Sequence, residues 1–328
     1  MESTKNYKYT GAIHIHTKAS DGSGSIDKIT KAAKKSGLSW IIITDHNVLG
    51  SKEGIINGVY VIQGEEISPA KENHYLALRI SETIEPSLNA VENIENVRNS
   101  GGFGFLAHPD ECDNRKNKYK PIKWECENAT PDGVEIWNWF SQFADNYDDS
   151  NIFRMLYSYF FRKNLITKPY RKTLNRWDKL NLDTEKIVPA IGGLDAHALK
   201  IRKFLIPITV FPYEFMFKTI VNQVLLTEPL NEDFETAKTQ ILTALKFGHN
   251  IIANLSVCGE IPEIFVTNEG DNKFLNIKTT PKAEIFVFKD GKFFSNLAHT
   301  KITENGKYRV EIEIKSRGFA YSNPIVVE

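Results

Sequence analysis

The sequence predicts an α/β fold with parallel strands, followed by a small antiparallel β module. Two observations predict this architecture. Short apolar strands and amphipathic helices alternate over the first 110 residues, which is the order of parallel βαβ units. After about residue 255, runs that alternate apolar and polar residues are separated by turn residues, as in antiparallel sheets. We therefore expect two units that meet near residue 256.

The N-terminal unit opens with a short strand and a well-delimited helix. Residues 9–15 form a strand-like run that contains His14 and leads to His16. Ser25 suits the N-cap of a helix with apolar residues at helical spacing, and Gly37 suits its C′ position. Residues 40–43 are a continuous apolar run of the kind buried on both faces of a parallel sheet. Further strands are expected at 59–63, 75–78 and 103–107, with a helix at 87–100.

The middle of the chain, residues 137–185, is rich in aromatic residues and mostly helical in pattern. It is either an inserted helical layer over the mouth of the first unit or ordinary core. An amphipathic helix begins at Phe234 and is closed by Gly248. We expect residues 1–255 to form the first unit, with the helical insertion near 137–185. Residues 256–328 are expected to form a small β-sandwich-like unit, with strands at 263–266, 283–288 and 308–314.

Composition and charge limit the classes of function. Among 328 residues, Lys+Arg and Asp+Glu both number 41, which argues against a binder of long nucleic acid because such proteins carry a basic excess. Three scattered cysteines are too few for a disulfide framework, and the polar N-terminus lacks the apolar core of a signal peptide. No apolar run reaches membrane-spanning length. We expect a cytoplasmic protein with no membrane association and no obvious protein partner.

Histidines and carboxylates gather where the predicted strands end or begin. Six of the eight histidines lie there with three acidic residues: His14, His16, His46, His74, His108, His197, Asp21, Glu66 and Asp195. In (β/α) barrels the carboxyl ends of the strands carry the site. Imidazole and carboxylate together suit zinc, manganese or iron. One histidine at a strand end is most simply structural, but six of them predict a metal site.

In chain order these segments resemble the motifs of the PHP (polymerase and histidinol phosphatase) superfamily over roughly residues 9–200. The motifs are His14-Ile15-His16-Thr17 with Ser20-Asp21-Gly22, Thr44-Asp45-His46, Gly64-Glu65-Glu66-Ile67-Ser68, His74, Ala107-His108-Pro109 and Gly193-Leu194-Asp195-Ala196-His197. The C-terminal part, with Ala320-Tyr321-Ser322-Asn323-Pro324, is similar to the carbaryl-hydrolase-like branch of these proteins.

The resemblance implies a distorted (β/α)7 barrel with two or three divalent ions (Mn, Zn or Fe) at the carboxyl ends of its strands. It implies a first ion on His14, His16, Glu66 and Asp195, a second on Asp21, His46 and His197, and a third on Glu66, His74 and His108. Glu66 rather than Glu65 matches the family pattern Gly-x-Glu. Strand alternation then turns Glu65 to the opposite face.

The implied activity is hydrolysis of a phosphate ester. A divalent ion lowers the pKa of a bound water from about 15.7 to about 7, and the resulting hydroxide attacks phosphorus. We expect a small phosphomonoester, or a nucleotide or oligonucleotide phosphate, as substrate, and leave the general acid unassigned. Basic residues near the motifs either bind the phosphate or are ordinary surface charges: Lys18, Lys71, Arg115, Lys200 and Arg202.

Two other functions remain open. The same site can hydrolyse a carbamate, ester or amide, or the chain is a non-catalytic metal-binding module, which its complete motifs disfavour. Single residues also have open roles: Asp45 either orients an imidazole or caps a following helix, and Glu135 ends another strand at a position that resembles the barrel mouth. The aromatic residues of 137–161 either pack in the core, stack on a nucleobase or cover a pocket.

Overall fold

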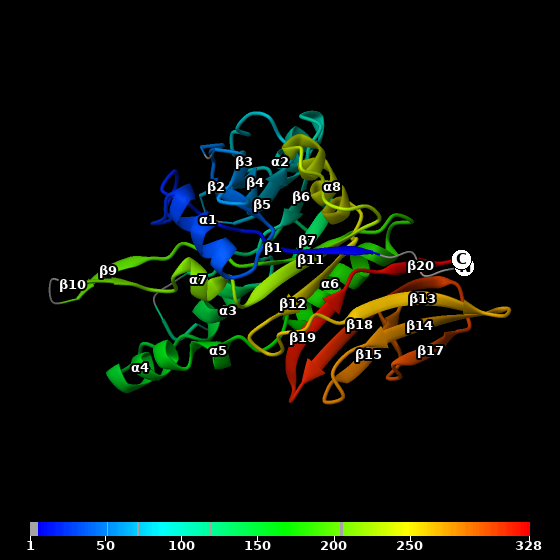
Figure 1. Cartoon of the computed structure of the whole chain (residues 1–328). Coiled ribbons are helices and arrows are strands. Elements are labelled where there is room, and N and C mark those ends of the chain that lie inside the picture. Colours follow the sequence, from blue (N-terminus) through cyan, green and yellow to red (C-terminus); the bar gives the residue numbers. More distant parts are fainter. Residues whose placement is uncertain (1–5, 51, 71, 114, 118–119, 204–205) are drawn as a thin grey trace.

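The computed structural model of the chain describes residues 6–50, 52–70, 72–113, 115–117, 120–203 and 206–328. A long mixed sheet runs through the molecule, with helices packed against it (Figure 1). The strands of this sheet are β1 (Tyr7–Ala12), β2 (Trp40–His46), β3 (Gly54–Ile56), β4 (Val59–Ile67), β5 (Tyr75–Leu78), β6 (Phe103–Leu106), β7 (Gly133–Asn138), β8 (Ala190–Gly193), β11 (Ile220–Leu226), β12 (Asn250–Asn254), β15 (Glu284–Lys289), β16 (Lys292–Ser295), β18 (Gly306–Ile314), β19 (Arg317–Ser322) and β20 (Ile325–Val327).

Two smaller sheets and eight helices complete the described part of the chain. The small sheets are β9 (Lys200–Lys203) with β10 (Ile206–Thr209), and β13 (Glu263–Glu269), β14 (Asn272–Lys278) and β17 (His299–Ile302). The helices are α1 (Ile26–Lys35), α2 (Ala90–Asn99), α3 (Trp139–Asn146), α4 (Ile152–Phe160), α5 (Arg162–Leu165), α6 (Arg171–Leu182), α7 (Tyr213–Met216) and α8 (Phe234–Lys246). No helix among the described residues is both long and apolar enough to cross a membrane.

Local sequence signals set most helix ends. The Ser25 hydroxyl accepts a hydrogen bond from the Lys28 amide at the start of α1, and Gly37 follows its end with a φ of 77°, as predicted. Helix α2 begins later than expected because Asn89 caps it, accepting from the Val91 amide at 3.1 Å. Leu88 therefore lies outside the helix and is 85% exposed.

The strands β1, β2 and β4 are parallel to one another, as are β6, β7 and β8. The prediction of parallel strands is wrong for β5, which is antiparallel to β4 and to β6. The reason is the short connection of residues 68–74 between β4 and β5, since a parallel crossover needs a dozen residues or more. The reversed strand brings its first residues to the edge where its neighbours end.

The regular ladder of the main sheet stops at β8, so the strands do not form a closed ring. Beyond their ends, the segments that follow β1 and β8 pair directly. The Leu194 amide donates to the Ile13 carbonyl at 3.1 Å, and Ala196 and His14 are joined in the same way at 3.0 Å. These bonds place the first and last metal-site motifs side by side. The distorted (β/α)7 barrel stays a prediction.

Asparagine side chains replace backbone pairing beneath this junction. The buried Asn222 of β11 donates to the Gly192 carbonyl at 2.7 Å and accepts from the Gly192 amide at 3.0 Å. Asn323 makes the same two bonds with Ala190: its side chain accepts from the Ala190 amide at 2.6 Å and donates to the Ala190 carbonyl at 3.1 Å. A side chain at residue 192 would come within 2.6 Å of Ile220. The two asparagines thus anchor β8 where its neighbours pack too closely for a larger residue.

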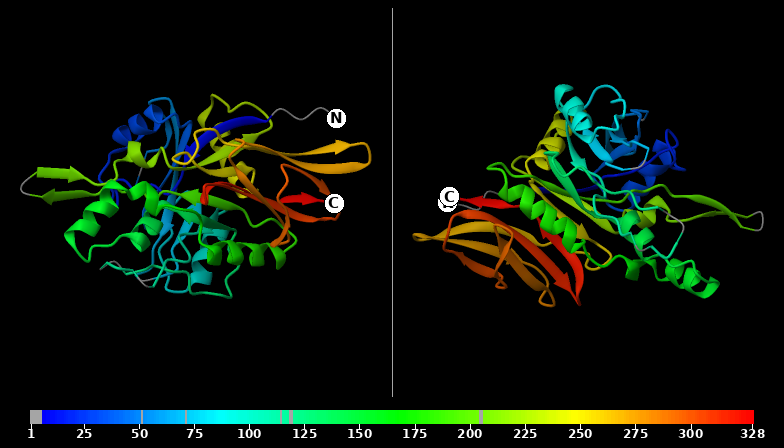
Figure 2. Two further views of the ribbon diagram at one scale, coloured as in Figure 1. Left: turned by 90° about the horizontal axis from the view of Figure 1, so that it is seen from below. Right: turned by 180° about the vertical axis from the view of Figure 1, so that it is seen from behind.

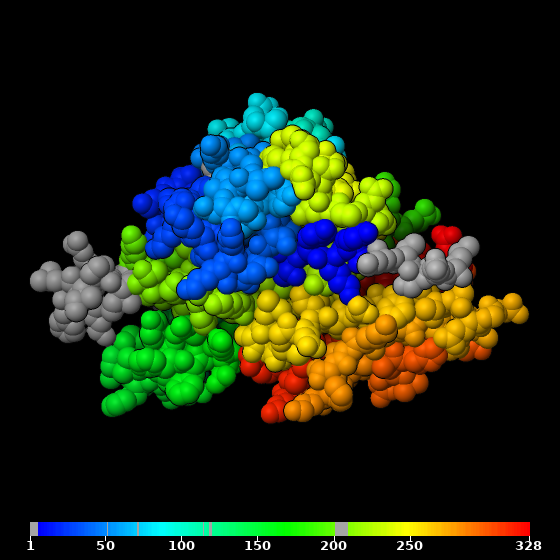
Figure 3. All heavy atoms as spheres, in the orientation of Figure 1, coloured from blue at the N-terminus to red at the C-terminus, as the bar shows by residue number. Residues whose placement is uncertain are grey.

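The C-terminal strands continue the main sheet, because β12 pairs with β19. Figure 2 shows strands β13 to β20 gathered on one side of the molecule, with α6 beside them. Asp178 of α6 joins Arg309 of β18 through two contacts of 2.6 Å and 2.7 Å. Residues after 256 also form the lower right of the face in Figure 3. The division into two units at residue 256 stays a prediction.

Substitution of Asn222 by alanine leaves both backbone groups of Gly192 unpaired in the interior. Each buried unpaired group costs about 1–3 kcal/mol, so we expect the free energy of unfolding to fall by about 2–4 kcal/mol in urea titrations. Asn272→Ala, at an exposed position of β14, is the matched control and is expected to unfold like the wild type. Equal midpoints for both variants would contradict the bridging role.

Candidate metal centre

The nine side chains expected to bind metal converge on one edge of the sheet. They follow or end the strands β1, β2, β4, β6 and β8, and His74 precedes the reversed strand β5. Eight of the nine have side chains that are buried or less than a third exposed, whereas that of Asp21 is 55% exposed. The sequence prediction that these residues share one site is consistent with this geometry. Their roles as ligands stay a prediction.

Glu66 lies at the centre of this cluster and faces five imidazoles. Its carboxylate oxygens lie 3.2 Å from His14, 3.4 Å from His16, 3.1 Å from His46, 2.8 Å from His74 and 3.1 Å from His108. Glu65 points away, as strand alternation requires, and accepts a hydrogen bond from the Ile84 amide at 2.9 Å. Burial raises the pKa of Glu65 to about 7.

Asp195 and Asp21 extend the cluster on either side of His16. One oxygen of Asp195 lies 3.2 Å from His16, 3.6 Å from His14 and 3.4 Å from His197. Asp21 lies 3.2 Å from His197 and 3.7 Å from both His16 and His46. Four groups have donor atoms within 4.8 Å of one another: His16-Asp21-His46-His197, His14-His108-Asp195, His14-His16-Glu66 and His46-Glu66-His74. They divide the ligands differently from the sets that the resemblance implies.

Buried polar atoms in the cluster fit a metal ion. Among the described residues, Nε2 of His14, both ring nitrogens of His16 and Oε2 of Glu66 are buried without a hydrogen-bond partner. Each such atom costs about 1–3 kcal/mol when it stays unsatisfied. A divalent ion accepts lone pairs from imidazole nitrogen and carboxylate oxygen. The donor set therefore suits zinc, manganese or iron, and a bound ion would satisfy these atoms.

The electrostatics of the cluster also favour cations. Burial opposes ionisation of Glu66 and Asp195, yet the neighbouring histidines, His14 first, hold the pKa of both carboxyls well below its usual range. Burial likewise opposes protonation of His108 and His197, but nearby carboxylates raise the pKa of both to about 9. Burial, together with the charge of His197, lowers the pKa of His16 to about 4. The carboxylates thus remain charged and require positive partners.

Several of these residues have backbone conformations that are uncommon for non-glycine residues. His14, Asp195 and His108 have φ values of 67°, 55° and 30°. The predicted strand of residues 9–15 is shorter in the structure, because β1 ends at Ala12. The rings of His14 and His16 still meet, with centroids 5.2 Å apart, because the chain turns at His14. Such backbone strain is typical of functional sites.

Glu135 orients His14 from outside the cluster. One of its oxygens lies 2.8 Å from Nδ1 of His14, and the other accepts from the His108 amide at 2.7 Å and from Asn138 at 3.0 Å. This contact turns Nε2 of His14 toward Glu66. Gly193 leaves the necessary room, because a Cβ there would lie 1.6 Å from Glu135. The position of Glu135 at a buried strand end was the only sequence signal for this role.

Asp45 anchors the loop that carries Asp21. Its carboxylate accepts from the Thr17 amide at 2.6 Å, from the Thr17 hydroxyl at 2.7 Å and from the Ser20 hydroxyl at 2.6 Å. In the described chain on either side of residue 51, β2 leads to β3 without an intervening helix. The helix-capping alternative for Asp45 is therefore wrong, and the loop contacts explain its burial.

A pocket of about 210 Å³ opens onto the cluster. Besides seven of the expected ligands, it is lined by Glu111, Arg115, Lys120, Ile122, Phe140 and Ala144. Lys18 and Lys200 are exposed and are not among its described lining residues. Lys71 and the side chain of Arg202 lie outside the part of the chain that the structure describes. Of the cations singled out in the sequence, Arg115 alone lines the pocket among described residues.

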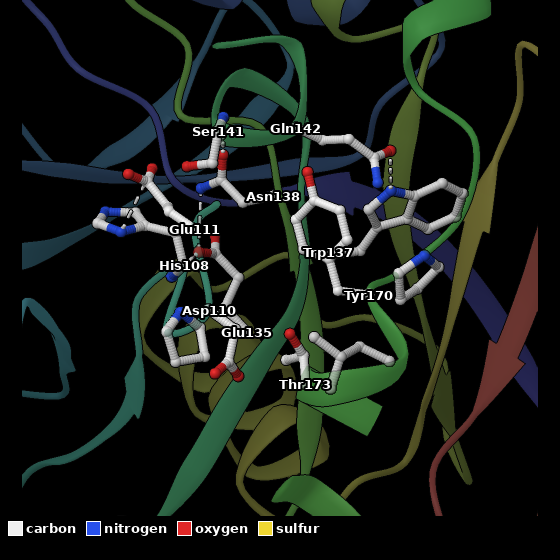
Figure 4. Close-up of a pocket in the computed structure, with 13 residues that line it drawn as sticks. His108, Asp110, Glu111, Glu135, Trp137, Asn138, Ser141, Gln142, Tyr170 and Thr173 are labelled. Atoms are coloured by element: carbon white, nitrogen blue, oxygen red, sulfur yellow. Dashed lines mark hydrogen bonds and ion pairs between the residues drawn. The ribbon is translucent and has the colours of Figure 1, made fainter. Parts of the chain in front are cut away.

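A smaller cavity of about 20 Å³ adjoins His108 and Glu135 (Figure 4). Figure 4 shows Glu111, Asn138 and Ser141 around it, and the volume is sufficient for one water molecule. Nδ1 of His108 and the Ser141 hydroxyl, both facing this region, have no hydrogen-bond partner among the described residues. The cavity therefore offers polar surroundings on the outer side of the His108 ring.

The aromatic residues of the helical insertion divide into two groups. Trp139 and Phe143 of α3 are buried and stack with centroids 5.7 Å apart, which favours the core alternative. Phe140 lines the pocket, with its ring centroid 5.5 Å from that of His197. Phe153 and Phe160 of α4 are 80% and 68% exposed. Core packing therefore describes Trp139 and Phe143, but it does not describe Phe140, Phe153 and Phe160.

Comparison with known proteins gives a consistent picture. The model of the PHP domain matches residues 12–123. An uncharacterized protein of Methanocaldococcus jannaschii is 32% identical over 152 residues, which cover 38% of this chain and 80% of that protein. A solved two-domain protein of Bacteroides vulgatus containing a predicted PHP-like metal-dependent phosphoesterase is similar over 98% of this chain and 96% of its own, with a TM-score of 0.51 and 14% identity. At that identity the structural likeness shows the fold alone.

Replacement of Glu135 by glutamine removes the charge that holds His14. Loss of such an orienting carboxylate weakens metal binding by about 10- to 100-fold, which we expect in calorimetric titrations with Mn²⁺. Glu65→Gln is the matched control, because Glu65 is equally buried and adjacent to Glu66 but points away from the cluster. Unchanged affinity in Glu135→Gln would show that Glu135 does not orient a ligand.

Metal affinity is expected to rise with pH. His108 and His197, each with a pKa of about 9 before metal binds, are protonated at lower pH and must lose a proton to bind an ion. Each proton released adds up to about tenfold in affinity per pH unit. Titrations from about pH 6 to about pH 8, in buffers of different ionisation enthalpy, measure both affinity and proton release. A flat profile with no proton release would contradict the assignment.

Proposed function

The chain belongs to the PHP domain family, and on that premise we propose that it is a metal-dependent phosphoesterase. The proposed substrate is a small phosphomonoester or a nucleotide or oligonucleotide phosphate. The observation that carries the proposal is the buried Glu66 facing five imidazoles beside a pocket of about 210 Å³. An exposed cation that lines the same pocket, Lys120, favours an anionic substrate over a neutral carbamate, ester or amide.

We propose two or three ions of Mn, Zn or Fe as cofactors, held by the three ligand sets that the family resemblance implies. Bound ions supply an activated water and neutralise charge on phosphate oxygens. The chain holds the donor atoms in place before substrate arrives: Glu135 fixes His14, and Asp45 fixes the loop of Asp21. The distorted (β/α)7 barrel, the cytoplasmic location and the absence of a membrane or protein partner stay predictions.

Hydrolysis of a small panel tests the proposed class of reaction. The panel contains p-nitrophenyl phosphate, its phosphodiester, nucleoside monophosphates and an aryl carbamate, each with Mn²⁺ and with a chelator. We expect Mn²⁺-dependent release from at least one phosphate ester, because the donor set suits divalent ions. Turnover of the carbamate alone would point to the alternative hydrolase. Metal binding without any turnover would point to the non-catalytic module.

Removal of a central donor is expected to abolish turnover without unfolding the protein. Asp195→Ala or His16→Ala deletes a side chain that contacts other residues of the cluster, and we expect kcat/KM to fall by more than the roughly 100-fold that outer carboxylates cause. Circular dichroism should stay unchanged, because a chain of this length folds on its apolar core. Asp271→Ala at an exposed turn is the control. Variants that keep most activity would refute the assignment.

A further inference from the structure

We propose that Lys120 binds the phosphate of the substrate and makes this site prefer phosphomonoesters over phosphodiesters. This inference rests on the proposed phosphoesterase function and adds a residue outside every motif that the sequence singled out. It follows from a difference between the two cations of the pocket. Arg115 contacts two carboxylates, whereas Lys120 has no ion pair with any described residue.

The charge of Arg115 is already neutralised by carboxylates. Its Nε contacts Asp145 at 2.6 Å, and one terminal nitrogen contacts Glu111 at 2.7 Å. The side chain is only 5% exposed. A guanidinium has three nitrogens that can donate and no acceptor; two of those of Arg115 face carboxylates, and the third donates to the backbone. We assign Arg115 to holding the backbone at Lys120 rather than to holding substrate.

The backbone contacts of this loop place Lys120 at the pocket. Arg115 donates from its other terminal nitrogen to the Lys120 carbonyl at 3.0 Å. Two residues later, the Ile122 amide donates to Glu111 at 2.5 Å. These two bonds fix the backbone that directly follows the Lys120 side chain. The exposed ammonium of Lys120 has no ion pair with any described residue, and Lys120 lines the same pocket as Glu66 and Asp195.

The apolar part of the pocket wall and the charge of Lys120 together predict which class of phosphate ester binds best. Ile122, Phe140 and Ala144 form an apolar surface beside Lys120, suited to the organic part of an ester. A phosphomonoester carries up to two negative charges and a diester one. Because Coulomb attraction scales with charge, one free ammonium in the pocket stabilises the bound monoester more strongly. Loss of that ammonium should therefore reduce the difference between the two substrates.

The test is Lys120→Met, which keeps the length of the side chain and removes its charge. In the Mn²⁺-loaded protein, kcat/KM for p-nitrophenyl phosphate is expected to fall about 10- to 100-fold, the range for a lost hydrogen bond to a charged group. The value for bis(p-nitrophenyl) phosphate is expected to fall by only about 3- to 10-fold, because half the charge loses about half the interaction free energy. Lys120→Arg should restore most of the monoester activity. Lys282→Met, at an exposed turn before β15, is the control for general loss of surface charge.

Equal losses for both esters, or no loss for either, would overturn the role of Lys120 while leaving the phosphoesterase in place. A second measurement separates this outcome from failure of the proposed function. Binding of inorganic phosphate to the Mn²⁺-loaded protein, followed by calorimetry, should weaken about tenfold or more in Lys120→Met. If the wild type hydrolyses no phosphate ester yet shows this difference, the phosphate site stands and the proposed reaction fails. Phosphate binding that is unchanged in the variant overturns the site itself.

Discussion

The buried charge of Glu66 is the constraint around which this edge of the molecule is arranged. A carboxylate that is 1% exposed costs several kcal/mol unless positive partners compensate it. Five imidazoles face it, and Asp195 adds a second buried negative charge among three of the histidines. Protonated histidines compensate the buried negative charges of Glu66 and Asp195 in part, and divalent ions compensate them more fully. A bound ion would also satisfy Nε2 of His14 and both ring nitrogens of His16, which lie buried without a hydrogen-bond partner among the described residues.

The fold meets this constraint by bringing distant segments to one edge of the sheet. Parallel strands place Glu66 and Asp195 at their carboxyl ends, and the reversed strand β5 brings His74 to the same edge. Direct pairing of the segments after β1 and β8 joins the first and last motifs. Beneath them, Asn222 and Asn323 hold β8 by side-chain hydrogen bonds. This edge of the sheet therefore sets the positions of the nine side chains, and the segment of Lys120 contributes to the pocket beside them.

Local patterns in the sequence were sufficient to predict the caps of α1, strands such as β2, β4 and β6, and a shared location for nine side chains. Ser25 and Gly37 delimit α1 because capping depends on neighbouring residues alone. The direction of β5 departs from the parallel pattern because residues 68–74 are too few for a crossover. Glu135 could not be assigned because its partner His14 lies 121 positions away. Asn222 gave no signal at all, since a buried asparagine in an apolar strand acquires meaning only when β8 packs beside it.

Anomalous diffraction from crystals grown with Mn²⁺ tests the metal centre most directly. Data collected above and below the Mn absorption edge locate each ion without reference to activity. The arrangement of donors predicts at least two peaks, one of them within bonding distance of the Glu66 carboxylate and of His14 or His16. The absence of a peak at Glu66, or peaks confined to other parts of the surface, would contradict the assignment of this cluster as a metal site.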